Sequence, residues 1–195
     1  MIYLPDHQAQ LGRGTPVPGR TQGSRDCGPR TVQMGLDKLT EGELVPTIPA
    51  LRKRMGTPGP VQTNVYDARE GVESYRVKGR KPLRYTIRDR IADVKRAVAG
   101  GKYVQCCIDY GHFNRSGRTG DPVFTGGHSI GVLGQRERQG EVWWLLWDPL
   151  DDARRAGIPQ GPRWVPRDRI VSAMESFAGA QGRAYAGVFT GGRKR

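Results

Sequence analysis

One cysteine, Cys27, lies where a polar stretch of the sequence gives way to a helical pattern. It stands in the run SRDCGP, and Val32 and Leu36 follow at helical spacing. The unpaired N–H groups and the positive dipole end of a helix start favour an anion, which lowers the pKa of a thiol and raises its thiolate fraction. Gly28, next to the thiol, leaves room for a substrate backbone. Cys27 is therefore a candidate nucleophile, although a cysteine at a helix start is by itself more often structural.

His128 and Asp148 stand at neighbouring ends of two apolar runs, GGHSIGVLG and VWWLLWDP, which flank the polar loop QRERQGE. A hairpin centred near Arg138 would pair His128 with Asp148, and directly opposed side chains face the same side of a sheet. The carboxylate would then orient the imidazole, and the imidazole would take the thiol proton of Cys27. A register error of one residue would separate the pair. Taken singly, the histidine reads as a structural residue and the aspartate as a turn residue.

A fourth polar residue, Gln22, precedes Cys27 in the sequence. Its side-chain amide can donate a hydrogen bond to the oxyanion that forms when a thiolate attacks a carbonyl, with the backbone N–H of Cys27 as the second donor. Simple solvation is the alternative for a glutamine in a polar loop. The other two cysteines, Cys106 and Cys107, are adjacent in an apolar run. We expect them to point to opposite faces of a strand as core residues, not to form a metal site.

The elements that must position these residues are helices first and strands later. Helical spacing predicts helices after Cys27 and over 47–55, 86–99 (with Thr86 as N-cap) and 166–177. Apolar runs predict strands over 103–109, 128–134, 142–147 and 184–189. This order is typical of an α+β protein with an antiparallel sheet and one late helix, not of alternating βαβ units.

The chain carries a net charge of +13, which favours polyanionic partners such as nucleic acid, anionic membranes or anionic cell-wall polymers. No zinc-finger spacing or aromatic-basic RNA motif supports specific nucleic-acid binding, which is the less favoured expectation without being excluded. No apolar stretch approaches the roughly 18–20 residues of a membrane span, and the first residues lack a secretory signal pattern. We expect a protein that is made in the cytoplasm and that associates with a virion.

These features in this order resemble the papain-like cysteine peptidases, above all the bacteriocin-processing (double-glycine leader) peptidases and their stand-alone relatives. The residues that carry the resemblance are Gln22, Asp26-Cys27-Gly28-Pro29, Gly127-His128 and Asp148-Pro149. The resemblance implies a papain-like fold, with the nucleophile at a helix start packed on an antiparallel sheet that carries the histidine and aspartate. It implies that Cys27 is the nucleophile, His128 the general base and acid, Asp148 the orienting residue and Gln22 the oxyanion donor. Gln22 stands slightly nearer the cysteine than is usual in that family.

The expected organisation is an extended Pro/Gly-rich arm (1–21), a papain-like peptidase domain (22–190) and a basic tail (191–195). The basic, loop-rich segment 56–85 has no counterpart in the family, and we expect a substrate-facing insertion there. The leader peptidases that work with an exporter are fused to a membrane transporter. Because this sequence contains no apolar stretch long enough to span a membrane, we do not expect it to have that role.

The resemblance implies hydrolysis of a peptide bond through an acyl-enzyme, with no cofactor and no metal. We expect a phage- or particle-associated hydrolase of bacterial cell-wall peptide, because the basic charge suits an anionic wall. Two alternatives stay open. One is a structural or adaptor virion protein on the same fold, whose N-terminal arm contacts other proteins of the particle. The other is a protease that processes a protein partner.

Overall fold

A computed structural model of the chain describes residues 26–59, 61–115, 126–149, 162–181 and 186–192. The helices and strands are α2 (Cys27–Thr40), α3 (Ile48–Arg54), α4 (Val65–Glu73), β1 (Arg84–Arg88), α5 (Ile91–Ala99), β2 (Tyr103–Asp109), α6 (Tyr110–Arg115), β3 (Gly127–Arg138), β4 (Glu141–Trp147), β5 (Arg163–Pro166), α7 (Arg167–Gln181) and β6 (Ala186–Thr190). Over these ranges, no helix combines the length and apolarity that a membrane crossing requires. The predicted arm (1–21) and most of the basic tail (191–195) lie outside the described residues.

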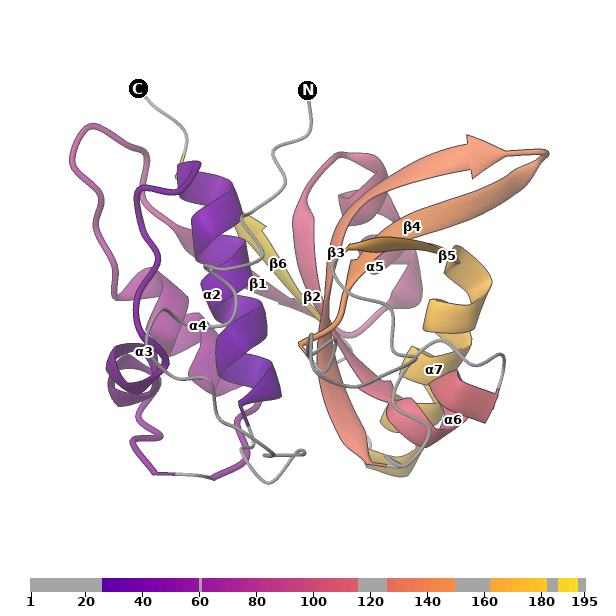
Figure 1. The fold of residues 1–195 in the computed structure, drawn as a ribbon, viewed down its shortest axis with the longest axis horizontal. Helices are drawn as coiled ribbons and strands as arrows, with labels where there is room; N and C mark the ends of the chain where they lie inside the picture. The colour runs from indigo at the N-terminus through magenta and orange to yellow at the C-terminus, as the bar shows by residue number, and fades with distance from the viewer. Residues whose placement is uncertain (1–25, 60, 116–125, 150–161, 182–185, 193–195) are drawn as a thin grey trace.

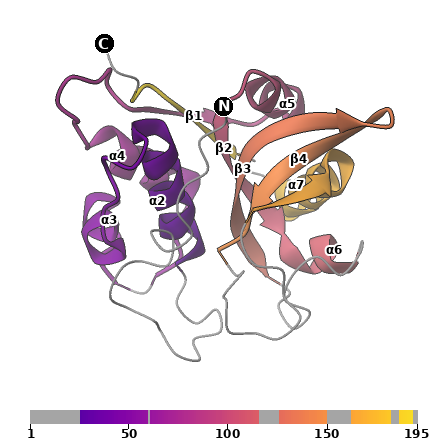
Figure 2. The same ribbon diagram turned by 45° about the horizontal axis from the view of Figure 1, so that its top comes forward.

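The strands form one six-stranded sheet in the order β1-β6-β2-β3-β4-β5, and every neighbouring pair is antiparallel (Figure 1). Helices α2, α3 and α4 gather on one side of the sheet, and α5, α6 and α7 on the other (Figures 1 and 2). Each side has its own buried apolar cluster. The α2–α4 cluster includes Val32, Leu51 and Val72, and the α5–α7 cluster includes Val94, Phe113 and Ile170. Cys106 belongs to the α5–α7 cluster and Cys107 packs against the α2–α4 cluster, so the two adjacent cysteines face opposite sides as predicted. The α+β class is confirmed.

The predicted helix 86–99 is wrong in its first part. Residues 84–88 form the edge strand β1, and the helix α5 begins only at Ile91. Ile87 suits a helical stripe with Ile91, but it also alternates with Tyr85, and β1 satisfies its backbone groups by pairing with β6. Three further elements were not predicted, namely α4, α6 and β5. Helix α4 occupies part of the segment expected to be an insertion, and its start is fixed by a capping box between Asn64 and Asp67.

The β3–β4 hairpin forms with a different register from the predicted one. The turn is at Gln139-Gly140, both with positive φ (54° and 76°), a conformation typical of a tight type I′ turn. Arg138 therefore pairs with Glu141, instead of marking the centre of the loop. The register then shifts by one residue at Leu133, between Val132 and Gly134, where a β-bulge interrupts the ladder.

Candidate active site

Three secondary-structure ends bring Cys27, His128 and Asp148 together. Cys27 is the first residue of α2, His128 is the second residue of β3, and Asp148 follows the last residue of β4. Thr31 joins the helix to the strand, because its one hydroxyl lies within hydrogen-bond distance of the carbonyls of Cys27 (2.7 Å) and Ser129 (3.1 Å). The Tyr103 hydroxyl in turn donates to the Thr31 carbonyl at 2.7 Å. The start of α2 is thus held against β3 at the position of His128.

His128 and Asp148 form a buried hydrogen bond, with 2.7 Å between Nε2 and Oδ1. The two residues are 4% and 1% exposed, so little water competes for this bond. An ionised carboxylate can only accept, which makes Nε2–H the donor. Nδ1 is then the ring nitrogen left for the Cys27 thiol, which is hydrogen-bonded to this imidazole. Asp148 therefore fixes both the tautomer and the orientation of the ring.

The bulge at Leu133 decides that His128 and Asp148 share a face. Beyond the bulge Gly131 pairs with Trp147, and continuing that register places Asp148 opposite position 130, two residues along the strand from His128. Side chains two residues apart lie on the same face. Without the bulge the register before it would place Asp148 opposite position 131, and the two side chains would diverge. The predicted direct pairing of His128 with Asp148 was wrong, but the predicted proximity is present.

The surroundings of Cys27 favour its thiolate. Burial alone would raise the pKa of this thiol, but the hydrogen bond and positive charge of His128 outweigh burial and lower the pKa. Backbone hydrogen bonds from Ser129 and Gly28 lower the pKa further. Cys27 is only half-buried, so a reagent or substrate can reach it. The residue combines the low pKa and the partial exposure that are typical of reactive cysteines.

The pKa of His128 moves in the opposite direction. Burial by itself disfavours the imidazolium, but the negative charge and hydrogen bond of Asp148, together with the contact to Cys27, raise the pKa well above its usual value. A lowered thiol pKa and a raised imidazole pKa favour a thiolate–imidazolium pair at neutral pH. This pair supplies a nucleophile and a proton donor in direct contact.

Asp148 has further partners that sequence reasoning missed. The Tyr110 hydroxyl donates to Oδ2 at 2.8 Å, and an Arg163 guanidinium nitrogen lies 3.6 Å from the same oxygen. The Tyr110 ring also meets the His128 ring edge to face, with 4.8 Å between centroids. Tyr110 directly follows the predicted strand 103–109, so the same strand-end argument that selected Asp148 would have found it. Arg163 begins β5, which the sequence pattern did not predict.

A buried polar chain supports the strand behind the candidate nucleophile. The Tyr85 hydroxyl donates to Gln105 Oε1 at 2.8 Å, and Gln105 Nε2 donates to Ser129 Oγ at 2.7 Å. Gln105 and Ser129 are 2% and 6% exposed. Because each buried polar group has a partner, this chain fixes the position of β3 where the Ser129 backbone meets Cys27. It involves neither His128 nor Asp148 directly.

Arg52 holds the residue that precedes Cys27. Its guanidinium contacts Asp26 Oδ1 through Nε (2.8 Å) and a terminal nitrogen (2.7 Å). It also donates to the carbonyls of Thr57, Gly59 and Val61 at 3.3, 2.8 and 3.1 Å. The same cation thus compensates the negative charge beside the thiol and fixes the loop that follows α3.

Gly28 packs closely against the loop that follows α3. A Cβ at this position would lie 2.1 Å from Thr63 Oγ1, so the loop after α3 occupies that space. Packing against Thr63 therefore requires glycine at position 28. Gln22, the predicted oxyanion donor, lies outside the described residues. The backbone N–H of Cys27 is in the first turn of α2, where no partner exists within the helix.

Among the described residues, no group of three or more His, Cys, Asp or Glu side chains is arranged to hold a metal ion. Comparison with models of known protein families and with curated protein sequences gives no match to this chain. The family resemblance therefore rests on the residues of the sequence itself.

Proposed function

We propose that the protein is a papain-like cysteine peptidase that hydrolyses peptide bonds of bacterial cell-wall peptide, as a phage- or particle-associated enzyme. The observation that carries the proposal is the hydrogen-bonded series from Asp148 through His128 to Cys27. The setting supports a papain-like fold, because a helix beginning at the thiol packs on an antiparallel sheet whose strand ends supply the other two residues.

The proposed reaction uses the thiolate–imidazolium pair. The Cys27 sulfur attacks the carbonyl carbon, and the backbone N–H of Cys27 with the proposed donor Gln22 stabilises the oxyanion. His128 Nδ1–H then protonates the leaving amine as the C–N bond breaks, which leaves a thioester on Cys27. A water molecule gives its proton back to His128 and attacks the thioester. The acid product leaves and the thiolate is restored.

The cell wall is proposed as substrate because of charge. A protein with a net charge of +13 is attracted to an anionic wall and concentrated there. Cys27, His128 and Asp148 determine the type of reaction, but they do not determine which peptide is cut. The substrate is therefore tested separately.

The test measures peptides released from purified bacterial cell walls by mass spectrometry. The unsubstituted protein is expected to release new peptide termini, and Cys27→Ala to lower the rate by at least about 1,000-fold. Cys107→Ser is the matched control and is expected to retain activity, because burial and the nearby Cys27 charge raise the pKa of Cys107 to about 12. Equal release by the Cys27→Ala variant would reject the nucleophile. No release while Cys27 still reacts with an alkylating reagent would reject the wall as substrate.

A further inference from the structure

A strongly basic edge lies apart from the candidate active site. Residues 76–90, RVKGRKPLRYTIRDR, contain seven Lys or Arg residues and one acidic residue, Asp89. Exposed cationic side chains in this segment are Arg76, Lys78, Lys81, Arg84 and Arg90, and Arg88 is partly exposed. We call these six residues the basic edge. The segment includes β1, which pairs only with β6 and so forms one edge of the sheet as described.

Strand geometry arranges part of the basic edge as a row. Tyr85 and Ile87 pack toward the α2–α4 cluster, so Arg84, Thr86 and Arg88 lie together on the opposite face of β1. Residues on one face of a strand repeat at about 6.6 Å. The row therefore presents two guanidinium groups, with a hydroxyl between them, along a line that suits an extended polymer of regularly spaced anions.

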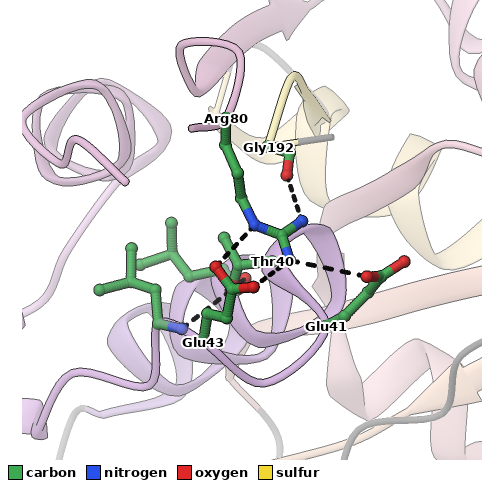
Figure 3. A network of polar contacts seen from close by, with 7 residues as sticks. Thr40, Glu41, Glu43, Arg80 and Gly192 are labelled. Carbon is green, nitrogen blue, oxygen red and sulfur yellow. Dashed lines mark hydrogen bonds and ion pairs between the residues drawn. The ribbon is translucent and has the colours of Figure 1, made fainter. Parts of the chain in front are cut away.

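The buried Arg80 fixes the loop that precedes this row. Its guanidinium makes 2.8 and 2.7 Å hydrogen bonds to the Glu43 carboxylate and a 2.6 Å bond to the Gly192 carbonyl, and it lies 3.6 Å from Glu41 (Figure 3). Gly192 N–H also donates to the Lys81 carbonyl at 3.1 Å. Arg80 thus joins the loop to the end of α2 and to the chain after β6. It also compensates both neighbouring glutamates, which leaves the exposed cations of the edge in excess.

The edge offers contacts to phosphates and none to bases. The one aromatic ring of residues 76–90 is Tyr85, which is 2% exposed and packs edge to face on Phe189. Proteins that bind single-stranded nucleic acid stack bases on exposed aromatic rings. The residues of the basic edge include no such ring.

The loop that begins the basic edge is separated from Cys27 by the length of α2. The Arg80 contacts lie just beyond the last residue of this 14-residue helix, and Cys27 is its first residue. At about 1.5 Å per residue the two ends are roughly 20 Å apart. Arg88, at the other end of the row, lies level with Cys106 of β2, but the row is on the face of the sheet away from α2. A polymer bound along that face therefore leaves the thiol open to a peptide.

We infer that the basic edge binds a phosphate-bearing anionic polymer of the bacterial cell wall, of the teichoic acid type, through its phosphate groups. The choice of a wall polymer rests on the proposed function. Binding there retains the protein on the wall while its candidate active site acts on wall peptide.

The test uses the full chain with Cys27→Ala, so that binding is read without hydrolysis. Walls that retain teichoic acid are expected to bind the protein in a salt-sensitive manner, and walls stripped of it to bind at least about 10-fold more weakly. Combined Lys81→Gln, Arg84→Gln and Arg88→Gln substitutions are expected to lower affinity for intact walls by about 10-fold or more. The matched control removes three other exposed charges, with Lys53→Gln, Arg69→Gln and Arg138→Gln, and is expected to change affinity by less than about 3-fold. Circular dichroism checks that both variants are folded.

Equal weakening by the two triple variants would assign binding to net charge and overturn the inference, as would unchanged binding to stripped walls. Competition by DNA at a lower phosphate concentration than soluble teichoic acid would assign the edge to nucleic acid and also overturn it. This assay reads the edge whether or not the unsubstituted protein hydrolyses walls, so the two proposals fail separately.

Discussion

At the residue scale, the environment of Asp148 explains how a carboxylate can stay ionised and correctly aimed in a dry site. Oδ1 accepts from His128, and Oδ2 accepts from Tyr110 with Arg163 nearby. Each oxygen therefore has its own donor, and the carboxylate cannot rotate without breaking a bond. Buried charges persist when they are paired and hydrogen-bonded in this way.

Tyr110→Phe tests whether the second oxygen matters. The change removes the hydroxyl that donates to Asp148 but keeps the ring beside His128. Loss of one hydrogen bond to a buried carboxylate is worth about 1.5–3 kcal/mol, so we expect kcat on a peptide substrate to fall by roughly 10–100-fold with little change in KM. Tyr66→Phe is the control, since Tyr66 is 52% exposed on α4. An unchanged kcat for Tyr110→Phe would show that the Tyr110 hydroxyl is not needed to hold the carboxylate.

Asp148→Asn tests the direction of the pKa shifts. Activity requires the Cys27 thiolate and the His128 imidazolium. The value of kcat/KM therefore rises with pH through the lowered thiol pKa and falls again through the raised imidazole pKa, which defines a pH window of activity. Removing the negative charge lowers the pKa of His128, which moves the alkaline limb of kcat/KM to lower pH. The acidic limb moves slightly upward, because a less populated imidazolium stabilises the thiolate less. A window that does not narrow would contradict the assignment of Asp148.

At the scale of elements, the start of α2 depends on a cation from α3. The Arg52 guanidinium compensates Asp26 and binds three carbonyls of the loop after α3, and its side chain is only 6% exposed. Breaking a buried pair by removing one partner leaves an uncompensated charge, which is strongly destabilising.

Arg52→Met is expected to lower the free energy of unfolding by about 3–5 kcal/mol and to raise the pKa of Cys27, because the Asp26 carboxylate is then unpaired. Adding Asp26→Asn to Arg52→Met is expected to recover part of the lost free energy of unfolding and to bring the pKa of Cys27 part of the way back. Urea denaturation measures the first quantity and the pH dependence of alkylation the second. If the double variant shows the same thiol pKa as Arg52→Met alone, the charge of Asp26 is not what Arg52 compensates.

The contact between β6 and β1 supports the polar chain behind Ser129. A Cβ at Gly187 would lie 1.7 Å from Tyr85 Cζ, so Gly187→Ala must displace the ring that donates to Gln105. We expect a loss of about 1–3 kcal/mol or more in stability, measured by thermal unfolding. Gly179→Ala is the matched control, because this α7 glycine has no atom within 4 Å of an added Cβ. It is expected to be stabilised by about 0.5–1 kcal/mol, since alanine favours a helix. Equal effects at both positions would contradict the packing argument.

At the scale of the whole molecule, the α+β class followed from the sequence because most elements have distinct apolar periods. Strand β2 matches its predicted bounds, and α3 and α7 lie close to theirs. The edge strand β1 was not separable from a helix by pattern alone, since Ile87 fits both periods and only its pairing with β6 decides between them. Strand β5 is four residues long, too short to show a period.

The candidate site was predictable where chemistry and strand ends coincide, and not where it depends on tertiary contacts. Cys27, His128 and Asp148 each carry a reactive or orienting group at an element boundary. The bulge at Leu133 has no distinct signal in the run GVLG, yet it sets the face that Asp148 shares with His128. Tyr110 could be selected as a strand-end residue, but its bond to Asp148, 38 positions away, is a tertiary contact that no local pattern reports. The same holds for the bond of Arg52 to Asp26, 26 positions away.

The most direct test of the thiolate–imidazolium pair is the rate of Cys27 alkylation by iodoacetamide as a function of pH, with mass spectrometry to identify the modified cysteine. Burial raises the pKa of Cys106 and Cys107, so Cys27 is expected to react first. The predicted profile has its midpoint well below the usual thiol pKa of about 8.5, and His128→Ala shifts the midpoint upward. A midpoint at the usual value, unchanged by His128→Ala, would contradict the account.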